Sequence, residues 1–422
     1  MPHCHIMDAA RSGSHLFFLS ELMNITKKGP PWEDLFHNSL HESAGHRRTV
    51  HDPPRRLFFV AGDKMSHDDI ATQFEIQGEL ASIIPFTMGH IHDSFVSTWQ
   101  TPHGLVRYVH QRLNQNVFSD IGALMRNIRR VTEHLRLHPV AGEKLLTLIP
   151  ARTGEDTWID GGGSHWRTFS YIENTEVFNL CPDVEHAFEA GRIFASFVAR
   201  LKDLRPASLA TTIPDFFDTP ARVRQLEKAI AQGQSGKLNL AVKEVEFVLQ
   251  RKAFCSIIAA PLAQNLLPER VIHFDPKLNN VLFDRDTGKE VCVVDLDTCM
   301  PGSLLYDFGD LVRTAGVDTV EDEPDASKIR LNLDLYEALL KGYVECLGQH
   351  MDPAEVRLLA QAPRLATLTI GMRFLADYIG GDTYFKVEHP EHNLQRARAQ
   401  FALVRSMEQL EPEMERIVSV LS

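Results

Sequence analysis

A group of polar side chains with chemically useful types and spacing lies between residues 270 and 298. His273, Asp275 and Asn280 follow an H-x-D-x-x-x-x-N pattern, and Asp295 comes directly after an apolar run at 291–294. Phosphoryl transfer needs a carboxylate that accepts the proton of the attacking hydroxyl. It also needs an amide oxygen and a second carboxylate to hold Mg²⁺ on the phosphates. We therefore predict Asp275 as the base and Asn280 and Asp295 as the metal ligands.

The segments around these residues have the pattern needed to bring them together. Residues 281–283 read as a short strand, DRDTGK as a polar turn, and 291–294 as the return strand, so Asp295 should lie close to Asn280. Lys277 is placed to neutralise charge that develops on the transferred phosphoryl group. We interpret His273 as a structural residue that holds the loop. The alternative is a surface turn that contains a buried aspartate.

Composition restricts the class of protein. The chain has 422 residues, with 44 Lys and Arg against 56 Asp and Glu, which gives a net charge of −12. An acidic balance argues against a general nucleic-acid binder. The sequence shows no apolar run of about 20 residues, the length that a membrane helix needs, and its start lacks the pattern of a signal peptide. The six cysteines form no C-x-x-C pair. We therefore expect a cytoplasmic enzyme with reduced thiols and a small-molecule substrate.

Patterning divides the chain into three parts. Residues 1–64 are rich in histidine and lack a sustained period, so we interpret them as a poorly ordered extension or as sequence upstream of the true start. Metal binding through His3, Cys4 and His5 is the alternative. Residues 65–173 suggest a small antiparallel sheet with one helix at 119–138. Apolar residues at 70–83 have mixed helical spacing, strands are expected at 94–100 and 105–113 around a Pro/Gly turn and at 144–152 and 165–173, and the glycines at 161–163 indicate a hairpin turn. Residues 174–422 read mainly as helices. The expected class is α+β with two lobes.

The sequence also resembles a known superfamily. The segments that carry the resemblance include GHIHDSF (89–95), YVHQRLNQNVFSD (108–120), TIPDFFDTPAR (212–222), VIHFDPKLNNVLFD (271–284) and GMRFLADYIGGDTYFKV (371–387). These segments resemble those of the aminoglycoside phosphotransferase/choline kinase superfamily. Within that superfamily, the resemblance is strongest to the N-acetylhexosamine 1-kinase-like group. The resemblance runs from about residue 70 to the C-terminus, and it implies a protein-kinase-like two-lobe fold.

The resemblance implies a nucleotide site for ATP with Mg²⁺. A loop that covers the phosphates would include Gly89, His90, Asp93 and Ser94. Protein kinases use a lysine of the next strand to bind the α- and β-phosphates. This chain has no lysine there, and Arg112 is the candidate cation for the phosphates. The alternative is that Arg112 is an exposed arginine at the edge of the sheet. The end of the strand near Tyr171 resembles the inter-lobe hinge, whose backbone would bind adenine.

The acceptor side is implied in the same way. The residues that match substrate-binding positions are Trp166, Arg167, Phe217, Asp218, Arg373 and Tyr384. Helix packing or ion pairing is the alternative for each of them. Asp297 either approaches the metal and phosphates or faces outward in a structural role. Asp307 and Asp310 are interpreted as carboxylates that hold the fold by capping the following helix. The chain departs from the family pattern at Phe217, where histidine is usual, and at His92, where asparagine is usual.

Together these observations predict an ATP- and Mg²⁺-dependent kinase that phosphorylates a hydroxyl of a small molecule. The resemblance favours the anomeric hydroxyl of an N-acetylhexosamine or a related sugar. An amino alcohol, a homoserine-like metabolite or an aminoglycoside is the alternative acceptor, and a polycationic aminoglycoside would need a pocket lined by carboxylates. A pseudokinase-like binding protein is the alternative from a different class. Neither nucleic acid nor a membrane is expected as a partner.

Overall fold

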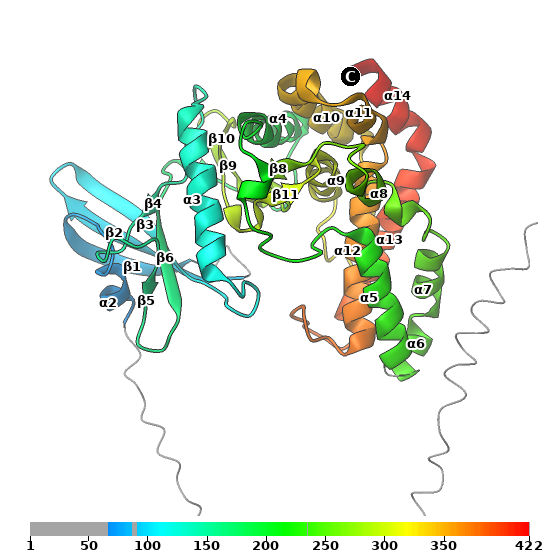
Figure 1. Cartoon of the computed structure of the whole chain (residues 1–422), viewed down its shortest axis with the longest axis horizontal. Helices are drawn as coiled ribbons and strands as arrows, with labels where there is room; N and C mark the ends of the chain where they lie inside the picture. The colour runs from blue at the N-terminus through cyan, green and yellow to red at the C-terminus, as the bar shows by residue number, and fades with distance from the viewer. Residues whose placement is uncertain (1–65, 87–90, 234, 422) are drawn as a thin grey trace, which may run out of the picture. The chain divides into compact units, whose positions relative to one another are not determined.

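The computed structural model describes residues 66–86, 91–233 and 235–421. The predicted extension at 1–64, including His3, Cys4 and His5, lies outside these residues, so that interpretation stays a prediction. The same holds for Gly89 and His90 of the predicted phosphate loop. The described residues begin with a short helix and a sheet and continue into a larger set of helices, coloured from blue to red along the chain in Figure 1. The predicted α+β class is confirmed.

The sheet is antiparallel and its strands follow the order β1-β2-β3-β6-β4, with β5 pairing to β6. Its strands are β1 (Glu79–Phe86), β2 (Asp93–Thr101), β3 (Gly104–Arg112), β4 (Leu148–Ile149), β5 (Trp158–Ile159) and β6 (His165–Ser170). The β2–β3 hairpin matches the two strands expected around the Pro/Gly turn. The glycines at 161–163 form the turn between β5 and β6, as predicted, and Gly163 has a φ of +81° that suits glycine.

Two predicted segments differ from the structure. The apolar spacing at 70–83 suggested a helix, but the helix α2 covers only His67–Ala71, and β1 follows it. Residues 144–152 were expected as a full strand, whereas only Leu148–Ile149 pairs with β6. The helix predicted at 119–138 is confirmed as α3 (Ile121–Leu137). The carboxylate of Asp120 accepts the amide of Ala123 at 2.8 Å and caps that helix.

The helical part contains one long buried helix with others packed on it. Its helices are α4 (Val184–Arg200), α5 (Thr219–Gln232), α6 (Ser235–Leu240), α7 (Val242–Leu249), α8 (Ala259–Ala263), α9 (Leu304–Ala315), α10 (Leu333–Leu347), α11 (Pro353–Leu358), α12 (Ala362–Gly380), α13 (His392–Gln409) and α14 (Glu411–Leu421). Helix α12 is buried along most of its length because α5, α9 and α13 all pack against it. In the described part of the chain, no helix is both long and apolar enough to cross a membrane.

Short strands inside the helical part hold both ends of the loop at residues 273–280, which we call the reactive loop. Strand β8 (Arg270–Ile272) pairs with β11 (Met300–Gly302), and β9 (Val281–Asp284) forms a hairpin with β10 (Glu290–Val293). A two-residue strand, β7 (Thr175–Glu176), adds to β9. The residues between β8 and β9 therefore leave one small sheet and enter another, which fixes both ends of the loop that carries Asp275.

Candidate active site

A buried carboxylate sets the shape of the reactive loop. Asp307 accepts the backbone amides of His273 at 2.8 Å and Phe274 at 2.7 Å. Phe274 has a φ of +66°, a conformation that non-glycine residues rarely adopt without support, and these two hydrogen bonds supply that support. Burial raises the pKa of Asp307 to about 7, although the two amide donors act in the opposite direction. The chain after β8 therefore turns sharply and exposes Asp275.

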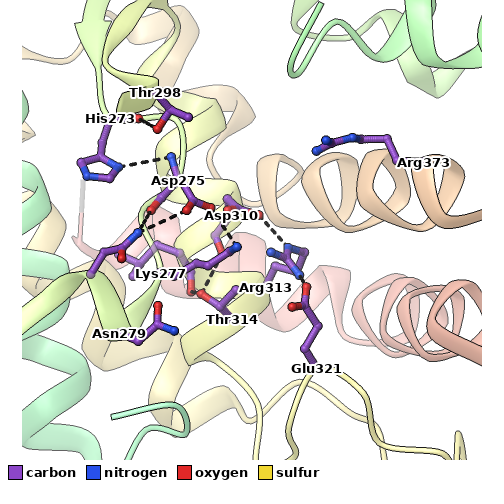
Figure 2. Close-up of polar contacts among 12 residues, drawn as sticks. His273, Asp275, Lys277, Asn279, Thr298, Asp310, Arg313, Thr314, Glu321 and Arg373 are labelled. Carbon is purple, nitrogen blue, oxygen red and sulfur yellow. Dashed lines mark hydrogen bonds and ion pairs between the residues drawn. The ribbon is translucent and has the colours of Figure 1, made fainter. Parts of the chain in front are cut away.

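His273 links this loop to the end of β10. Its Nδ1 accepts the amide of Asp275 at 3.2 Å, so its Nε2 carries the proton and donates to the carbonyl of Val294 at 3.0 Å. Burial lowers the pKa of the ring, which keeps it neutral. Thr298 donates its hydroxyl to the carbonyl of His273 at 2.7 Å, a contact that Figure 2 shows. These contacts agree with the structural role predicted for His273.

The Asp275 carboxylate lies between an amide and an ammonium group. Asn280 donates through Nδ2 to the Asp275 carbonyl at 2.9 Å and to its Oδ2 at 3.2 Å, so its Oδ1 stays free of these two bonds. Lys277 Nζ lies 3.0 Å from Asp275 Oδ1, and the carboxylate raises the pKa of the lysine, which is therefore a cation. The Asp275 side chain is 21% exposed and is thus accessible to a substrate. Figure 2 shows Lys277 and Asp275 side by side.

The hairpin brings Asp295 to this group, as the sequence predicts. Val293 pairs with Val281, and the amide of Val294 donates to the carbonyl of Asn280 at 2.9 Å. Asp295 follows with a φ of +60°. The residue retains contact with solvent. Partial burial of its carboxylate, and then the charges of Asp297 and Asp275, nevertheless raise its pKa to about 7. A divalent cation would relieve this repulsion between carboxylates.

The oxygen atoms available here fit Mg²⁺. This ion prefers oxygen ligands and usually takes one or two protein carboxylates, with water and substrate phosphates completing its shell. Asn280 and Asp295 supply such oxygens. Within the described residues, no cluster of three or more His, Cys, Asp or Glu has the arrangement of a metal site that the protein alone could complete. The two predicted ligands would therefore need the phosphates of a nucleotide as partners.

Asp297 faces inward and forms a buried ion pair with the sheet. Arg167 of β6 donates NH1 and NH2 to its two carboxylate oxygens, the second at 3.0 Å, and His92 Nε2 lies 2.5 Å from Oδ2. Burial would raise the pKa of Asp297, but the Arg167 charge and the His92 bond hold it well below its usual range. The outward orientation considered for Asp297 is wrong, and its structural role is supported.

Two residues expected on the acceptor side are instead structural. Arg167 is 2% exposed and uses its remaining Nε to bind Gln111 at 3.0 Å, so it has no group left for a substrate. Trp166 is 5% exposed in the core of the sheet, where it packs on Phe95 and donates Nε1 to Asp160 at 3.0 Å. Both predictions were wrong because successive residues of a β-strand point to opposite faces, and both faces of β6 are covered here.

The predicted nucleotide residues have partners of their own. Arg112 is half exposed and forms an ion pair with Asp93 across the β2–β3 hairpin, as the edge-arginine alternative expects. Ser94 accepts a long hydrogen bond of 3.4 Å from Gln111. Tyr171 follows β6 and donates its amide to the carbonyl of Arg107 at 3.0 Å, while the Arg107 guanidinium lies 3.9 Å from the centre of the Tyr171 ring. An adenine at this hinge would therefore have to use the carbonyl side of the Tyr171 peptide.

The DFFDTPAR turn contributes aromatic rings and a helix cap. Phe217 is buried, with ring centroids 6.2 Å from Phe274 and 5.7 Å from Tyr306, so it supports the reactive loop from behind. Its predicted contact with substrate is contradicted by this burial. Asp218 caps α5 through the amide of Ala221 at 2.9 Å, which engages one of its oxygens.

Asp310 holds the fold, as predicted, but not by capping a helix. Asp307 and Asp310 both lie inside α9, whose N-cap is Ser303. Asp310 accepts from Arg313 Nε at 2.6 Å, and Arg313 also pairs with Glu321. Figure 2 shows this chain of charges beside Lys277. The capping interpretation failed because the helix begins at Leu304, before both carboxylates.

Arg373 and Tyr384, both predicted on the acceptor side, lie next to each other. Arg373 NH2 lies 3.4 Å from the Tyr384 hydroxyl, and Asp377 accepts the amides of Thr383 and Tyr384, each at 2.9 Å, which fixes this segment. The sequence analysis did not single out Arg222, which lies near Arg373 and whose pKa is lowered partly by it. Its position four residues after the cap Asp218, on the first turn of α5, is the signal that could have drawn attention to it.

The comparisons with known proteins agree with this geometry. The family model described as "Phosphotransferase enzyme family" matches residues 108–341. A microcompartment-associated aminopropanol kinase is 17% identical with a TM-score of 0.53, and the match covers 82% of this chain and 96% of that one. An aminoglycoside phosphotransferase from Alicyclobacillus acidocaldarius is 14% identical with a TM-score of 0.53, over 87% of this chain and 100% of that one.

A third solved structure, a choline kinase from Cryptosporidium parvum, is 11% identical with a TM-score of 0.50, over 82% of this chain and 95% of that one. At these identities the likeness concerns the fold, which is the predicted two-lobe kinase-like fold. The different acceptors named for these proteins show that this fold is used with more than one kind of small molecule.

Proposed function

The chain belongs to the phosphotransferase enzyme family, and we propose that it transfers the terminal phosphoryl group of ATP to a hydroxyl of a small molecule. One observation carries the proposal. Asp275 is held by Asn280 at 2.9 and 3.2 Å on a loop whose hairpin brings Asp295 beside it. This arrangement supports the roles of Asp275 as the base and of Asn280 and Asp295 as oxygen ligands for Mg²⁺.

Each residue has a distinct task in this proposal. Asp275 orients the acceptor hydroxyl and takes its proton. Asn280 and Asp295 would hold Mg²⁺, which supplies positive charge to the phosphates when it is bound. Lys277 pairs with Asp275 at 3.0 Å and can turn to the transferred phosphoryl group, where positive charge stabilises the transition state. The presence of all four residues supports an active enzyme over a binding protein that has lost turnover.

We propose a sugar of the N-acetylhexosamine type, phosphorylated at its anomeric hydroxyl, as the acceptor. The support is the pairing of Arg373 with Tyr384, which offers hydrogen-bond donors beside the aromatic ring of Phe216, 4.9 Å from the guanidinium. A polycationic or amino-alcohol acceptor would need free carboxylates. Two nearby carboxylates are engaged, Asp310 by Arg313 at 2.6 Å and Asp275 by Lys277 at 3.0 Å.

Replacing Asp275 with asparagine tests the proposed reaction. We expect Asp275→Asn to lower kcat by about 10²–10⁴-fold, because the amide cannot accept the proton, and to leave nucleotide binding largely intact. Turnover is followed as ADP release and binding by titration calorimetry. The matched control is Asn279→Ala on the same loop, since Asn279 binds Asn179 at 3.2 Å rather than Asp275. Near-normal turnover of Asp275→Asn would refute the assignment.

The acceptor class is tested by a screen of ATP consumption. The panel contains free hexoses, N-acetylhexosamines, amino alcohols and aminoglycosides, and each product is checked by mass spectrometry for one added phosphoryl group. We expect turnover with a sugar and none with the amines. Turnover with an amino alcohol alone would overturn the sugar proposal but not the kinase proposal.

A further inference from the structure

Two arginines from different helices lie at the same level beside the reactive loop. Helices α5 and α12 run in the same direction, because Thr219 contacts Thr369 at 2.8 Å near the start of α5, and a Cβ on Gly233 at its end would meet Ile379. Arg222 is three residues after Thr219, and Arg373 is four residues after Thr369. One helical turn beyond the threonine contact therefore brings both side chains to one place.

Phe216 contacts both guanidinium groups. Arg222 NH2 donates to the carbonyl of Phe216 at 3.4 Å, and the centre of the Phe216 ring is 4.9 Å from Arg373 Cζ. The Tyr384 hydroxyl adds a further polar group, 3.4 Å from Arg373 NH2. Tyr384 and Phe385 add further rings near Arg373, at 5.7 and 5.5 Å, and Arg222 NH1 donates to Gln225 at 2.9 Å. We call Arg222 and Arg373 the arginine pair.

The arginine pair lacks the carboxylate partner that its burial calls for. Burial and then the charge of Arg373 lower the pKa of Arg222 to about 10, and burial lowers the pKa of Arg373. Arg222 Nε is buried and makes no hydrogen bond. Among the residues that the structure describes, no carboxylate lies within ion-pair distance of either arginine. Half-buried arginines elsewhere in the helical part do have one, as Arg270 with Glu355 at 2.8 Å shows.

The acidic groups that face the arginine pair are already engaged or remote. Asp215 and Asp218 act on Arg222 through space, but Asp215 is exposed and beyond ion-pair distance, and Asp218 caps α5. Asp310 and Asp275 act on Arg373 in the same way, and they are paired with Arg313 and Lys277. Two partly desolvated cations held together without a counter-charge are costly unless an anion completes the site.

Arg373 of the arginine pair faces the base of the proposed reaction. Figure 2 shows Arg373 leaving α12 on the side where Asp275, Lys277 and Asp310 lie. From this arrangement we infer that the acceptor carries an anionic group, a carboxylate or a phosphate, which the arginine pair binds. This inference rests on the proposed kinase function. A guanidinium binds such groups through two parallel hydrogen bonds, and Asp275 repels them. The anionic end of the acceptor is therefore directed to the arginines and a hydroxyl to Asp275.

The charge of the acceptor can be varied while its anomeric hydroxyl is kept. The three probes are N-acetylglucosamine, its 3-O-lactyl ether, which carries a carboxylate, and its 6-phosphate. We expect kcat/KM with ATP and Mg²⁺ to be at least about 30-fold higher for one of the two anionic sugars than for the neutral one. The identity of the better probe distinguishes a carboxylate from a phosphate ligand. Equal or better turnover of the neutral sugar would overturn the inference.

Variants of the arginine pair give an independent readout. Arg222→Gln and Arg373→Gln should each lower the ratio of anionic to neutral kcat/KM by about 10–100-fold, mainly through KM, and Arg222→Lys should restore part of it. The matched control is Arg224→Gln, an exposed arginine of the same helix, which should leave the ratio unchanged. Folding of each variant is checked by its Tm. A ratio that does not respond to Arg222→Gln or Arg373→Gln in folded protein would also overturn the inference.

Failure of the inference is separable from failure of the kinase proposal. If none of the three sugars reacts, the acceptor found in the wider screen decides the question. A neutral or cationic acceptor would overturn the inference and leave the kinase proposal standing. Absence of phosphoryl transfer to every acceptor would refute the kinase proposal and, with it, the inference that rests on it.

Discussion

At the scale of single residues, buried charges hold the site in shape. Asp307 supports the turn at Phe274, and Asp297 joins the loop after Asp295 to Arg167 of β6 and to His92, which directly precedes β2. Neither carboxylate has to touch a substrate to matter. Each fixes a backbone segment that carries a residue of the proposed reaction, so loss of either would act on the reaction through position.

The Asp297 ion pair gives a prediction about stability. Asp297→Ala should lower the free energy of unfolding by about 3–5 kcal/mol, because it leaves the buried Arg167 charge without its partner. The double variant Arg167→Met/Asp297→Leu should cost clearly less, since it removes both charges. Urea denaturation of the single variants Arg167→Met and Asp297→Leu and of their double variant measures the coupling. If the costs of the two single variants add up to the cost of the double variant, Asp297 and Arg167 do not stabilise the fold as a pair.

At the scale of elements, the close packing of β11 on the reactive loop deserves a direct test. A Cβ on Gly302 would lie 2.4 Å from the Phe274 ring and 2.8 Å from Ile272. Gly302→Ala should therefore displace Phe274 and, with it, Asp275. We expect a loss of about 1–3 kcal/mol in stability and a fall in kcat of about 10–100-fold.

The control for this prediction is Gly161→Ala in the turn between β5 and β6, where an added Cβ meets no atom within 4 Å. It should change neither Tm nor kcat noticeably. Stability is read from urea denaturation and kcat from ADP release. Normal kcat in Gly302→Ala would mean that the loop adjusts without moving Asp275.

The contact between α4 and β10 gives a prediction about pH. Burial first, and then Glu189, raises the pKa of Glu290 to about 8, well above its ordinary value of 4.5, although Arg192 acts against this. The folded protein therefore favours the protonated acid. This contribution to stability is present at low pH and is lost as the pH rises from about 4.5 through 8.

Glu290→Gln places an uncharged amide where the wild type has the protonated acid. The variant should therefore not lose this stability as the pH rises. We expect wild type and variant to unfold at similar Tm at pH 5, and the variant to be more stable by about 1–3 kcal/mol at pH 8.5, since a tenfold change in proton affinity is worth about 1.4 kcal/mol. Thermal denaturation over this pH range is the measurement. A variant that is less stable at pH 8.5 would show that the ionised Glu290–Arg192 pair is the favourable state.

At the scale of the whole molecule, the proposed nucleotide site joins the sheet to the helical part. A ligand that binds only the folded protein stabilises it, by about 2.7 kcal/mol at 100 times its Kd. We expect ATP with Mg²⁺ to raise the Tm of Asp275→Asn, in which turnover does not consume the nucleotide. Chelation of the metal by EDTA should remove most of this shift, and so should Asp295→Asn. An ATP shift of the same size with and without Mg²⁺ would contradict the metal-ligand roles of Asn280 and Asp295.

The elements that local sequence determines were largely predictable. Helix α3, the β2–β3 hairpin and the β9–β10 hairpin arise from residues that are close in the chain, and their period, caps and turns are visible there. The same holds for Asp275 and Asn280, whose mutual distance is set by five residues of one loop. This spacing, the hairpin that follows it and the family resemblance together led to the predicted reaction.

Only the tertiary structure decided which charges are engaged and which are free. Nothing in the local sequence distinguishes Arg167, whose guanidinium is bound by Asp297, from Arg373, which has no carboxylate at ion-pair distance in the described chain. Burial and pairing depend on residues far along the chain, and a charge has a different free energy in each environment. The sequence by itself therefore determined which residues of the loop we predict to transfer a phosphoryl group. The packing of distant elements decided which arginines lack a carboxylate partner, and our inference about the charge of the acceptor rests on that packing.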